Sequence, residues 1–197
     1  MAGILLISPT RHVMLHLNAC CKWKEYIRTK RELLTKLKNT NLKSKREAIL
    51  EIKEIQQGDK LWTQVIEYAK NCSWRAGAVL AKNMEKNLFS DWERVLVALD
   101  GTDIVGYCTV QKKDCIPDVE YSPYICFLFV GESYRGRRLS QELIIHALEY
   151  FKYLGCSKAY LVSGEIGLYE KYGFSKIADK KDIWGNEEQI FVIDIKG

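Results

Sequence analysis

The sequence predicts an α+β (mixed α/β) protein, in which a central mixed β-sheet is flanked by helices and preceded by an extra N-terminal helical segment. The first observation is that apolar residues recur at steps of three and four through the first half of the chain. The second is that, from about residue 92, strand and helix patterns follow one another in the order β-β-β-α-β-α-β-β. With 197 residues, the chain is long enough for one domain with its own core and an appendage.

Four helices are predicted before residue 92, and their N-terminal signals separate them. The first runs over residues 12–39, and the second, over residues 44–58, begins with a capping box at Ser44–Glu47. The apolar stripe of this second helix consists of Ile49, Ile52 and Ile55. Asp59 and Ser73 are expected to cap the third and fourth helices. The apolar faces of these two helices are Trp62, Val65, Ile66 and Ala69 in the third, and Leu80 and Met84 in the fourth.

The second half of the chain contains six strand patterns and two helix patterns. Asp100-Gly101 is a hairpin signal between the first two strands. The third strand, residues 125–130, is apolar at every position, which is typical of a strand buried on both faces. A long helix over residues 139–154 and a short one over residues 166–172 are each followed by a glycine. The six strands are predicted at residues 94–99, 104–110, 125–130, 158–162, 174–177 and 189–195.

No segment of the sequence is expected to span a bilayer. Charged residues make up 28% of the chain, and its apolar runs are much shorter than the roughly 20 residues that span a bilayer. The N-terminus lacks the basic start and cleavage site of a signal peptide, so a cytoplasmic protein without a membrane partner is expected. The seven cysteines include no CxxC pair, and an odd number of them indicates free thiols.

No metal site and no nucleic-acid partner are predicted. His12 and His16 have the spacing of one helix face, but no carboxylate or cysteine completes a recognisable ligand set, so two ordinary helix residues is the better interpretation. The net charge of +5 is mild. The Lys- and Arg-rich residues 22–46 are interpreted as the solvated face of an amphipathic helix, although a nucleic-acid surface is the alternative.

The segment VGESYRGRRLSQELI, residues 130–144, places a basic glycine turn between a buried strand and a long helix. The first turn of a helix presents unpaired N–H groups and a partial positive charge. A glycine lets a ligand approach the backbone closely, and arginines add charge-assisted hydrogen bonds. The turn lacks the endings of a Walker A loop and of a dinucleotide GxGxxG motif. It therefore predicts a cradle for phosphate or pyrophosphate, and a solvated surface turn is the alternative.

This segment resembles the coenzyme A pyrophosphate loop of the GCN5-related N-acetyltransferase (GNAT) family, whose usual form is Q/R-x-x-G-x-G/A. Arg135 matches the first position, whereas Arg138 and Ser140 replace the usual small residues. The segment LYEKYGF, residues 168–174, resembles the LYxxxGF motif of the same family. The resemblance covers residues 73–197, and the family's first strand is not evident. It implies a GNAT domain over residues 59–197 and an N-terminal helical extension over residues 1–58.

The resemblance implies an N-acetyltransferase that uses acetyl-coenzyme A as cosubstrate and transfers the acetyl group to a primary amine by direct attack. Tyr169 is expected to be the general acid for the leaving thiolate. The pantetheine arm would pair with the third strand like an added strand, which needs a splay or bulge beside it. The predicted coenzyme-binding residues are Phe127, Leu128, Phe129, Val130, Arg135, Gly136, Arg137, Arg138, Leu139 and Ser140.

The general base and the acceptor stay open. Glu120 is a candidate base, as are Asp91 and Glu93, although each also reads as a surface acid. A covalent route through Cys126 is disfavoured, because no histidine nearby in the sequence would activate the thiol. The aromatic residues Tyr121, Tyr124 and Trp184 either shape an acceptor pocket or cover the sheet. The acceptor would be a small-molecule or peptide amine, and a homodimer is left open. The alternative function is a non-catalytic acyl-coenzyme A-binding module with a helical interaction platform.

Overall fold

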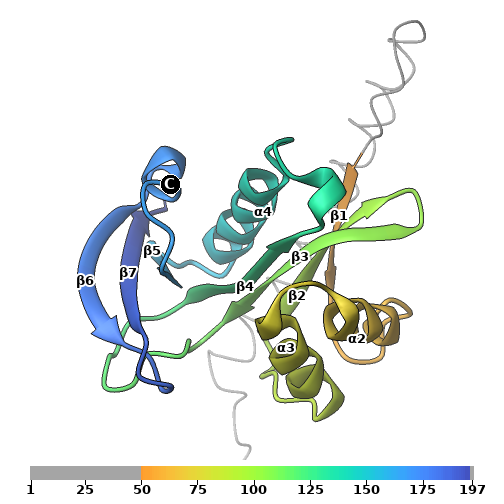
Figure 1. Ribbon diagram of the computed structural model, residues 1–197, viewed down its shortest axis with the longest axis horizontal. Coiled ribbons are helices and arrows are strands. Elements are labelled where there is room, and N and C mark those ends of the chain that lie inside the picture. Colours follow the sequence, from red (N-terminus) through yellow and green to blue (C-terminus); the bar gives the residue numbers. More distant parts are fainter. Residues whose placement is uncertain (1–49, 196–197) are drawn as a thin grey trace, which may run out of the picture. The chain divides into compact units, whose positions relative to one another are not determined.

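Seven strands form one sheet in the computed structural model, which describes residues 50–195 (Figure 1). The strand order is β1-β2-β3-β4-β5-β7-β6, and every neighbouring pair is antiparallel except β4 and β5. The strands are β1 (Leu50–Ile55), β2 (Arg94–Asp100), β3 (Asp103–Gln111), β4 (Tyr124–Val130), β5 (Lys158–Ser163), β6 (Ser175–Lys181) and β7 (Glu187–Asp194). The helices are α2 (Trp62–Asn71), α3 (Arg75–Glu85) and α4 (Leu139–Tyr153), with short 3₁₀ turns at Glu132–Tyr134 and Glu170–Tyr172. The predicted α+β class is therefore confirmed.

The helices cover the sheet from both sides and bury two hydrophobic layers. Helix α4 packs on one face with Leu96 and Ala98 of β2, whereas α2 and α3 pack on the other face with Val95 and Val97. Because successive side chains of a strand point to opposite faces, an unbroken apolar run such as that of β2 is what a strand between two helical layers requires. The crossover from β4 to its parallel neighbour β5 runs through α4 (Figure 1).

Strand β1 corrects the helix predicted over residues 44–58. The segment LEIKEI pairs antiparallel with β2 from Leu50↔Asp100 to Ile55↔Val95. An isoleucine spacing of three fits one helix face, but Ile52 packs in the layer of α4 and Ile55 in the layer of α2 and α3. Pairing with the edge of the sheet therefore overrides the local helix signal. Residues 50–55, which the sequence analysis placed in the N-terminal extension, thus belong to the sheet.

Other predictions differ from the structure in detail. Helices α2 and α3 occur where expected, but neither predicted capping side chain caps its helix. The Asp59 carboxylate instead accepts a hydrogen bond from the Gln56 amide at 2.7 Å. The Ser73 hydroxyl is hydrogen-bonded to Glu132. The short helix predicted over residues 166–172 is reduced to the 3₁₀ turn at its end. The helix predicted over residues 12–39, with His12 and His16, lies outside the described residues. No helix within residues 50–195 is both long and apolar enough to cross a bilayer.

Candidate active site

The sheet opens between β4 and β5. These two strands pair only at Tyr124↔Tyr160 and Ile125↔Leu161, and then diverge. On its other side, β4 carries a bulge, because the register with β3 shifts between the pairs Tyr107↔Phe129 and Thr109↔Cys126. The second half of β4 therefore has no strand partner on the β5 side among the described residues. The structure thus contains the splay and the bulge that an added pantetheine strand requires.

Phe127 lies at the bulge with a positive φ of 49°. A bulky side chain rarely adopts this backbone conformation, which costs about 1–3 kcal/mol unless its surroundings impose it. The ring of Trp74, at the start of α3, meets Phe127 edge-on at 6.4 Å and stacks on Phe129 at 6.3 Å. These contacts hold the strained residue in place and form an aromatic wall along the second half of β4. Strain of this kind, imposed by packing, is a common mark of a functional site.

The basic turn opens directly onto the start of α4. Gly136 has a φ of 76° and Arg138 a φ of 61°, and both residues are exposed. A Cβ added at Gly136 would meet no atom of the protein within 4 Å. The first intrahelical hydrogen bond comes from the Glu142 amide to the Arg138 carbonyl at 3.1 Å, so the amides ahead of it in the first turn have no intrahelical acceptor. The geometry is that of an anion cradle at a helix N-terminus.

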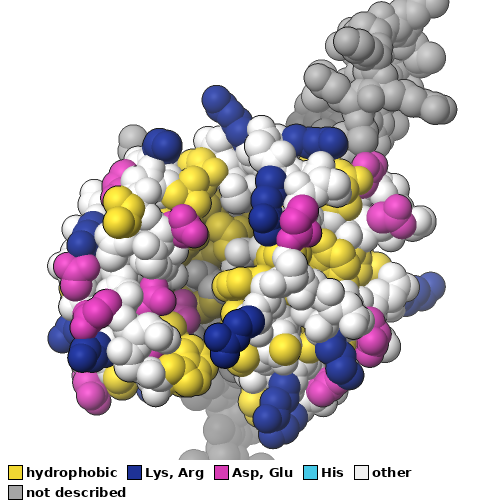
Figure 2. Space-filling view, viewed as in Figure 1, with side chains coloured by type: hydrophobic (Ala, Val, Ile, Leu, Met, Phe, Trp, Pro, Cys, Tyr) yellow, Lys and Arg dark blue, Asp and Glu magenta, His cyan; other side chains and the backbone are white. Residues whose placement is uncertain are grey.

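The three arginines of the turn are held differently. The Arg135 guanidinium donates to Glu132 at 3.1 Å and to the Val130 carbonyl at 3.2 Å, so it braces the turn. Arg137 lies over the Tyr134 ring, 4.9 Å from its centroid. Arg138 forms no ion pair within the described residues. Lys and Arg side chains gather around the turn in Figure 2. Arg137 and Arg138 are therefore the arginines most available to a ligand, whereas Arg135 is partly committed to Glu132.

Tyr169 is buried between aromatic rings. Its side chain is 7% exposed, and its ring lies 5.5 Å from that of Phe191 and 6.2 Å from that of Phe174. Burial raises the pKa of Tyr169, and the charge of Glu165 adds to this, against a lowering contribution from a hydrogen bond with Ser163. The phenol therefore keeps its proton at neutral pH, as a general acid must.

A second tyrosine of the same motif reaches the cradle. The Tyr172 hydroxyl lies 2.9 Å from the Ser140 hydroxyl in the first turn of α4. This contact joins the turn after β5 to the predicted coenzyme loop. Sequence reasoning missed Tyr172 because the spacing of the motif singles out only Tyr169.

The carboxylates named from the sequence occupy different environments. Glu93 accepts hydrogen bonds from the amides of Ser90 at 2.6 Å and Lys112 at 2.7 Å, so its side chain ties two loops together. Asp91 and Glu120 are exposed.

Asp114, which the sequence analysis did not single out, lies half-buried in the loop between β3 and β4 and accepts a hydrogen bond from the Cys115 amide at 2.7 Å. Burial raises the pKa of the Asp114 carboxyl, against lowering hydrogen bonds from its cysteine neighbours. Its charge in turn contributes to the raised pKa values of Tyr124 and Tyr169. The Asp114 charge thus helps to raise the pKa of one tyrosine on β4 and of another in the segment after β5, the two strands that border the opening.

Cys126 is 3% exposed and is a poor nucleophile. Burial, followed by the charge of Asp114, raises the pKa of its thiol well above the ordinary value. Because the thiolate is the reactive form, this environment disfavours an acyl-cysteine route. No set of three or more His, Cys, Asp or Glu side chains within residues 50–195 is arranged to hold a metal ion.

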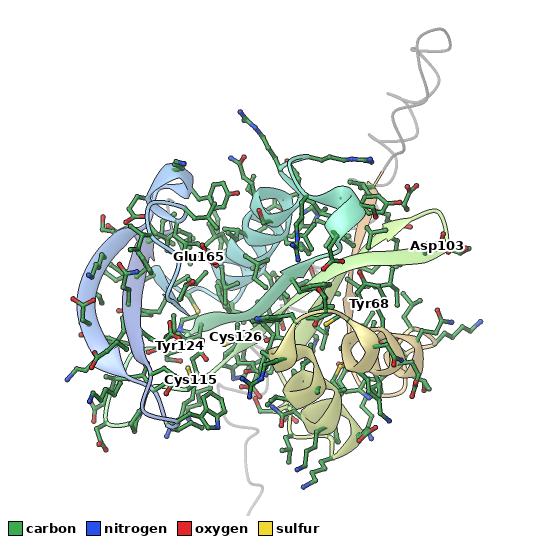
Figure 3. All side chains as sticks on the ribbon, in the orientation of Figure 1. Tyr68, Asp103, Cys115, Tyr124, Cys126 and Glu165 are labelled. Carbon is green, nitrogen blue, oxygen red and sulfur yellow. The ribbon has the colours of Figure 1, made fainter. Side chains whose placement is uncertain are left out.

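A hollow of about 200 Å³ lies beside the paired end of β4. Tyr121 and Tyr124 line it, together with Asp114 of the loop between β3 and β4. Tyr121 also stacks on Tyr160 of β5 at 4.8 Å. Trp184, on the turn between β6 and β7, is 63% exposed and is not among the lining residues. Figure 3 shows Tyr124, Cys126 and Cys115 near one another in this region, with Glu165 farther along the opening.

A sheet that opens beside a strand bulge, next to a basic helix start, defines the class of coenzyme A-dependent N-acyltransferases. The model of the acetyltransferase (GNAT) family matches residues 62–174. The chain therefore belongs to the GNAT family, which confirms the resemblance, and it is an acyltransferase. Among curated proteins, none matches the sequence.

Three solved structures illustrate the shared fold. A GNAT-family acetyltransferase from Desulfovibrio desulfuricans has a TM-score of 0.57 at 16% identity, over 75% of this chain and 99% of that one. An aminoglycoside 6'-N-acetyltransferase complexed with coenzyme A has a TM-score of 0.57 at 14% identity, over 75% and 98%. A spermidine/spermine N-acetyltransferase from Vibrio cholerae has a TM-score of 0.51 at 17% identity, over 74% and 92%.

Proposed function

We propose that this protein transfers an acetyl group from acetyl-coenzyme A to a primary amine by direct attack. The observation that carries the proposal is the opening of the sheet between β4 and β5, which leads to the basic start of α4. The pantetheine amides would pair with the unpartnered side of Phe127–Val130. The pyrophosphate would be bound by the first-turn amides of α4 and by Arg137 and Arg138. Arg135 would act mainly by fixing the turn, because Glu132 already holds its guanidinium.

The reaction needs three contributions from the chain. The amine nitrogen attacks the thioester carbonyl carbon, and the new C–N bond places negative charge on the carbonyl oxygen. A backbone N–H at the bulge of β4 would stabilise that charge, because the bulge turns the backbone of Phe127 out of the ladder with β3. When the C–S bond breaks, the leaving thiolate takes a proton from Tyr169. The proton that the attacking ammonium must lose goes to a carboxylate, directly or through water, and Glu120 is the base proposed from the sequence.

Removal of the two arginines tests the coenzyme site. We expect Arg137→Ala combined with Arg138→Ala to weaken acetyl-coenzyme A binding by about tenfold or more in isothermal titration, since each charge-assisted contact contributes about 1.5–3 kcal/mol. Lys152→Ala is the matched control, because it removes an exposed cation at the other end of α4. Wild-type affinity in the double variant would refute the cradle.

Turnover tests the reaction itself. Acetyl-coenzyme A is incubated with a panel of amines, and release of free thiol is followed. Acetylated amine with stoichiometric thiol supports the proposal. Tight coenzyme binding without transfer to any amine of the panel would instead favour the non-catalytic acyl-coenzyme A-binding module.

A further inference from the structure

The loop between β3 and β4 places a carboxylate against the strand that carries the bulge. The Cys126 thiol donates to the Lys113 carbonyl at 3.8 Å and also to the carboxylate of the next residue, Asp114. Cys126 directly precedes Phe127, the residue with the positive φ, and consecutive Cα atoms are about 3.8 Å apart. The Asp114 carboxylate therefore contacts the residue next to the bulge, where the thioester is proposed to bind.

The hollow and the bulge share one face of the sheet. Ile125 packs in the layer of α4. Because side chains alternate along a strand, the neighbouring side chains of Tyr124 and Cys126 point to the opposite face. Tyr124 and Asp114 line the hollow there, and Phe127 packs on the same face, in the layer of α2 and α3. An amine that enters through the hollow would therefore approach β4 on the face where the Asp114 carboxylate lies.

The Asp114 carboxylate is held in place without being neutralised. It accepts a hydrogen bond from the Cys115 amide at 2.7 Å, and the thiols of Cys115 and Cys126 also donate to it. Lys113 lines the same hollow, but neither Lys113 nor any other Lys or Arg within residues 50–195 forms an ion pair with Asp114. Burial raises the pKa of the Asp114 carboxyl, and a base acts best when its pKa lies near the working pH.

Several titratable groups surround Asp114. They are Lys113, Cys115, Asp118 and Tyr121 of its own loop, Tyr124 and Cys126 of β4, Tyr169 after β5, and Asp182 and Glu188 beside the turn between β6 and β7. Burial raises the pKa of Cys115, Cys126 and Tyr124, so these three groups keep their protons at neutral pH. Asp114 is therefore the group beside Cys126 that can accept a proton there.

We propose that Asp114, rather than Glu120, is the general base of the reaction. The hollow, of about 200 Å³, has room for several water molecules, so the carboxylate can act directly or through one of them. Glu120 is exposed and is not among the residues that line the hollow. The inference rests on the proposed function, because it assigns a residue to a step of the same reaction.

The acceptor ammonium loses two protons on the way to the amide. Asp114 takes the first, and the lone pair that this frees on nitrogen forms the bond to the thioester carbonyl carbon. When the C–S bond breaks, Tyr169 gives its proton to the leaving thiolate, and the second proton of the nitrogen restores the phenol through solvent. Asp114 then releases its proton to solvent through the hollow. The products are the amide, the free thiol and one proton.

The test is the pH profile of the single-turnover rate, measured with the amine of the panel that the wild type acetylates fastest. The amine itself becomes protonated as the pH falls, which slows every variant equally. The wild type should show an additional loss below the pKa of Asp114, because a protonated carboxyl cannot act as a base. Asp114→Asn should lower the rate at neutral pH by about 10²-fold or more and lack this additional loss. Asp114→Glu, which keeps a carboxylate, should retain it.

Two matched variants separate Asp114 from other carboxylates of its loop. Asp118→Asn removes an exposed carboxylate that lines the same hollow, and Glu120→Gln removes the base predicted from the sequence. Both should keep a rate within about twofold of the wild type and the same additional loss at low pH. Coenzyme affinity and melting temperature, measured for each variant, identify a folding defect.

Cys126→Ala tests the assignment without changing the carboxylate itself. The thiol favours the charged form of Asp114, so its removal should raise the pKa of that carboxyl and move the additional loss to higher pH. If Asp114→Asn does not fold, an unchanged profile in Cys126→Ala refutes the proposal.

A folded Asp114→Asn with the wild-type profile, or a Glu120→Gln variant that lacks the additional loss, would overturn the assignment of Asp114 and leave the acetyl transfer itself intact. If the wild type acetylates no amine of the panel, the proposed function fails, and the assignment of the base falls with it.

Discussion

Replacing Tyr169 by phenylalanine separates the two roles that its position allows. The ring packs against Phe174 and Phe191, and phenylalanine keeps those contacts. Only the hydroxyl is lost, together with its interaction with Ser163. A neutral hydrogen bond contributes about 1 kcal/mol to stability, so the free energy of unfolding should fall by about that amount or less. Removal of a general acid, by contrast, lowers the rate by about 10²–10⁴-fold.

We therefore expect Tyr169→Phe to lower kcat by at least about tenfold, with coenzyme affinity within about twofold of the wild type. The assay follows thiol release under single-turnover conditions, so that product release does not hide the chemical step. Tyr172→Phe is the matched control, since it removes the other hydroxyl of the motif and its 2.9 Å contact with Ser140 at the cradle. This control should affect coenzyme binding more than the chemical step.

The pH profile gives an independent check on Tyr169. Burial raises the pKa of its phenol above the ordinary value of 10.0, so the acid form persists to higher pH than in water. Wild-type activity should therefore show no loss from this group below about pH 10. A single-turnover rate of Tyr169→Phe equal to that of the wild type would refute the reasoning. Tyr169 would then be a packing residue, and Tyr172 would become the first candidate for the acid.

Three further predictions concern the cradle, the bulge and the core. Gly136→Val should abolish coenzyme binding, because the new side chain would enter the cradle, and the φ of 76° should cost about 1–2 kcal/mol of stability. Gly101→Val is the control, since this glycine has a φ of 63° in the hairpin. It should destabilise the protein by a similar amount but leave the coenzyme affinity in titration unchanged. Gly106→Ala should lower the free energy of unfolding by about 1–3 kcal/mol, because the new Cβ would lie 2.8 Å from the Phe129 carbonyl oxygen. The midpoint of urea unfolding measures this loss, and a midpoint equal to that of the wild type would contradict the contact. Burial raises the pKa of Tyr150 to about 12, so the unfolded chain loses this proton first and stability should fall by about 2 kcal/mol between pH 10 and 12. In thermal melts across that range, Tyr150→Phe should show a shallower decline, and an unchanged slope would count against the assignment.

Local patterns in the sequence determined most elements of the sheet domain and the position of the coenzyme loop. The strand β4, the glycine turn and the start of α4 are contiguous, so one stretch of sequence specifies all three. The apolar stripes of α2, α3 and α4 also follow directly from periodicity, because each helix buries one face. These features depend on interactions between residues close together in the chain, which a sequence pattern can express.

Tertiary structure decided what depends on distant pairing. Residues 50–55 carry a helix-like isoleucine spacing, and only the open edge of β2 makes them a strand. The divergence of β4 from β5 is equally invisible in sequence, since both strands continue as ordinary β patterns past their last shared pair. The hollow brings together Asp114 from a polar loop and Tyr124 from β4. In the sequence Asp114 reads as an ordinary residue of a polar loop, because only the folded sheet and the burial it imposes bring it beside Tyr124.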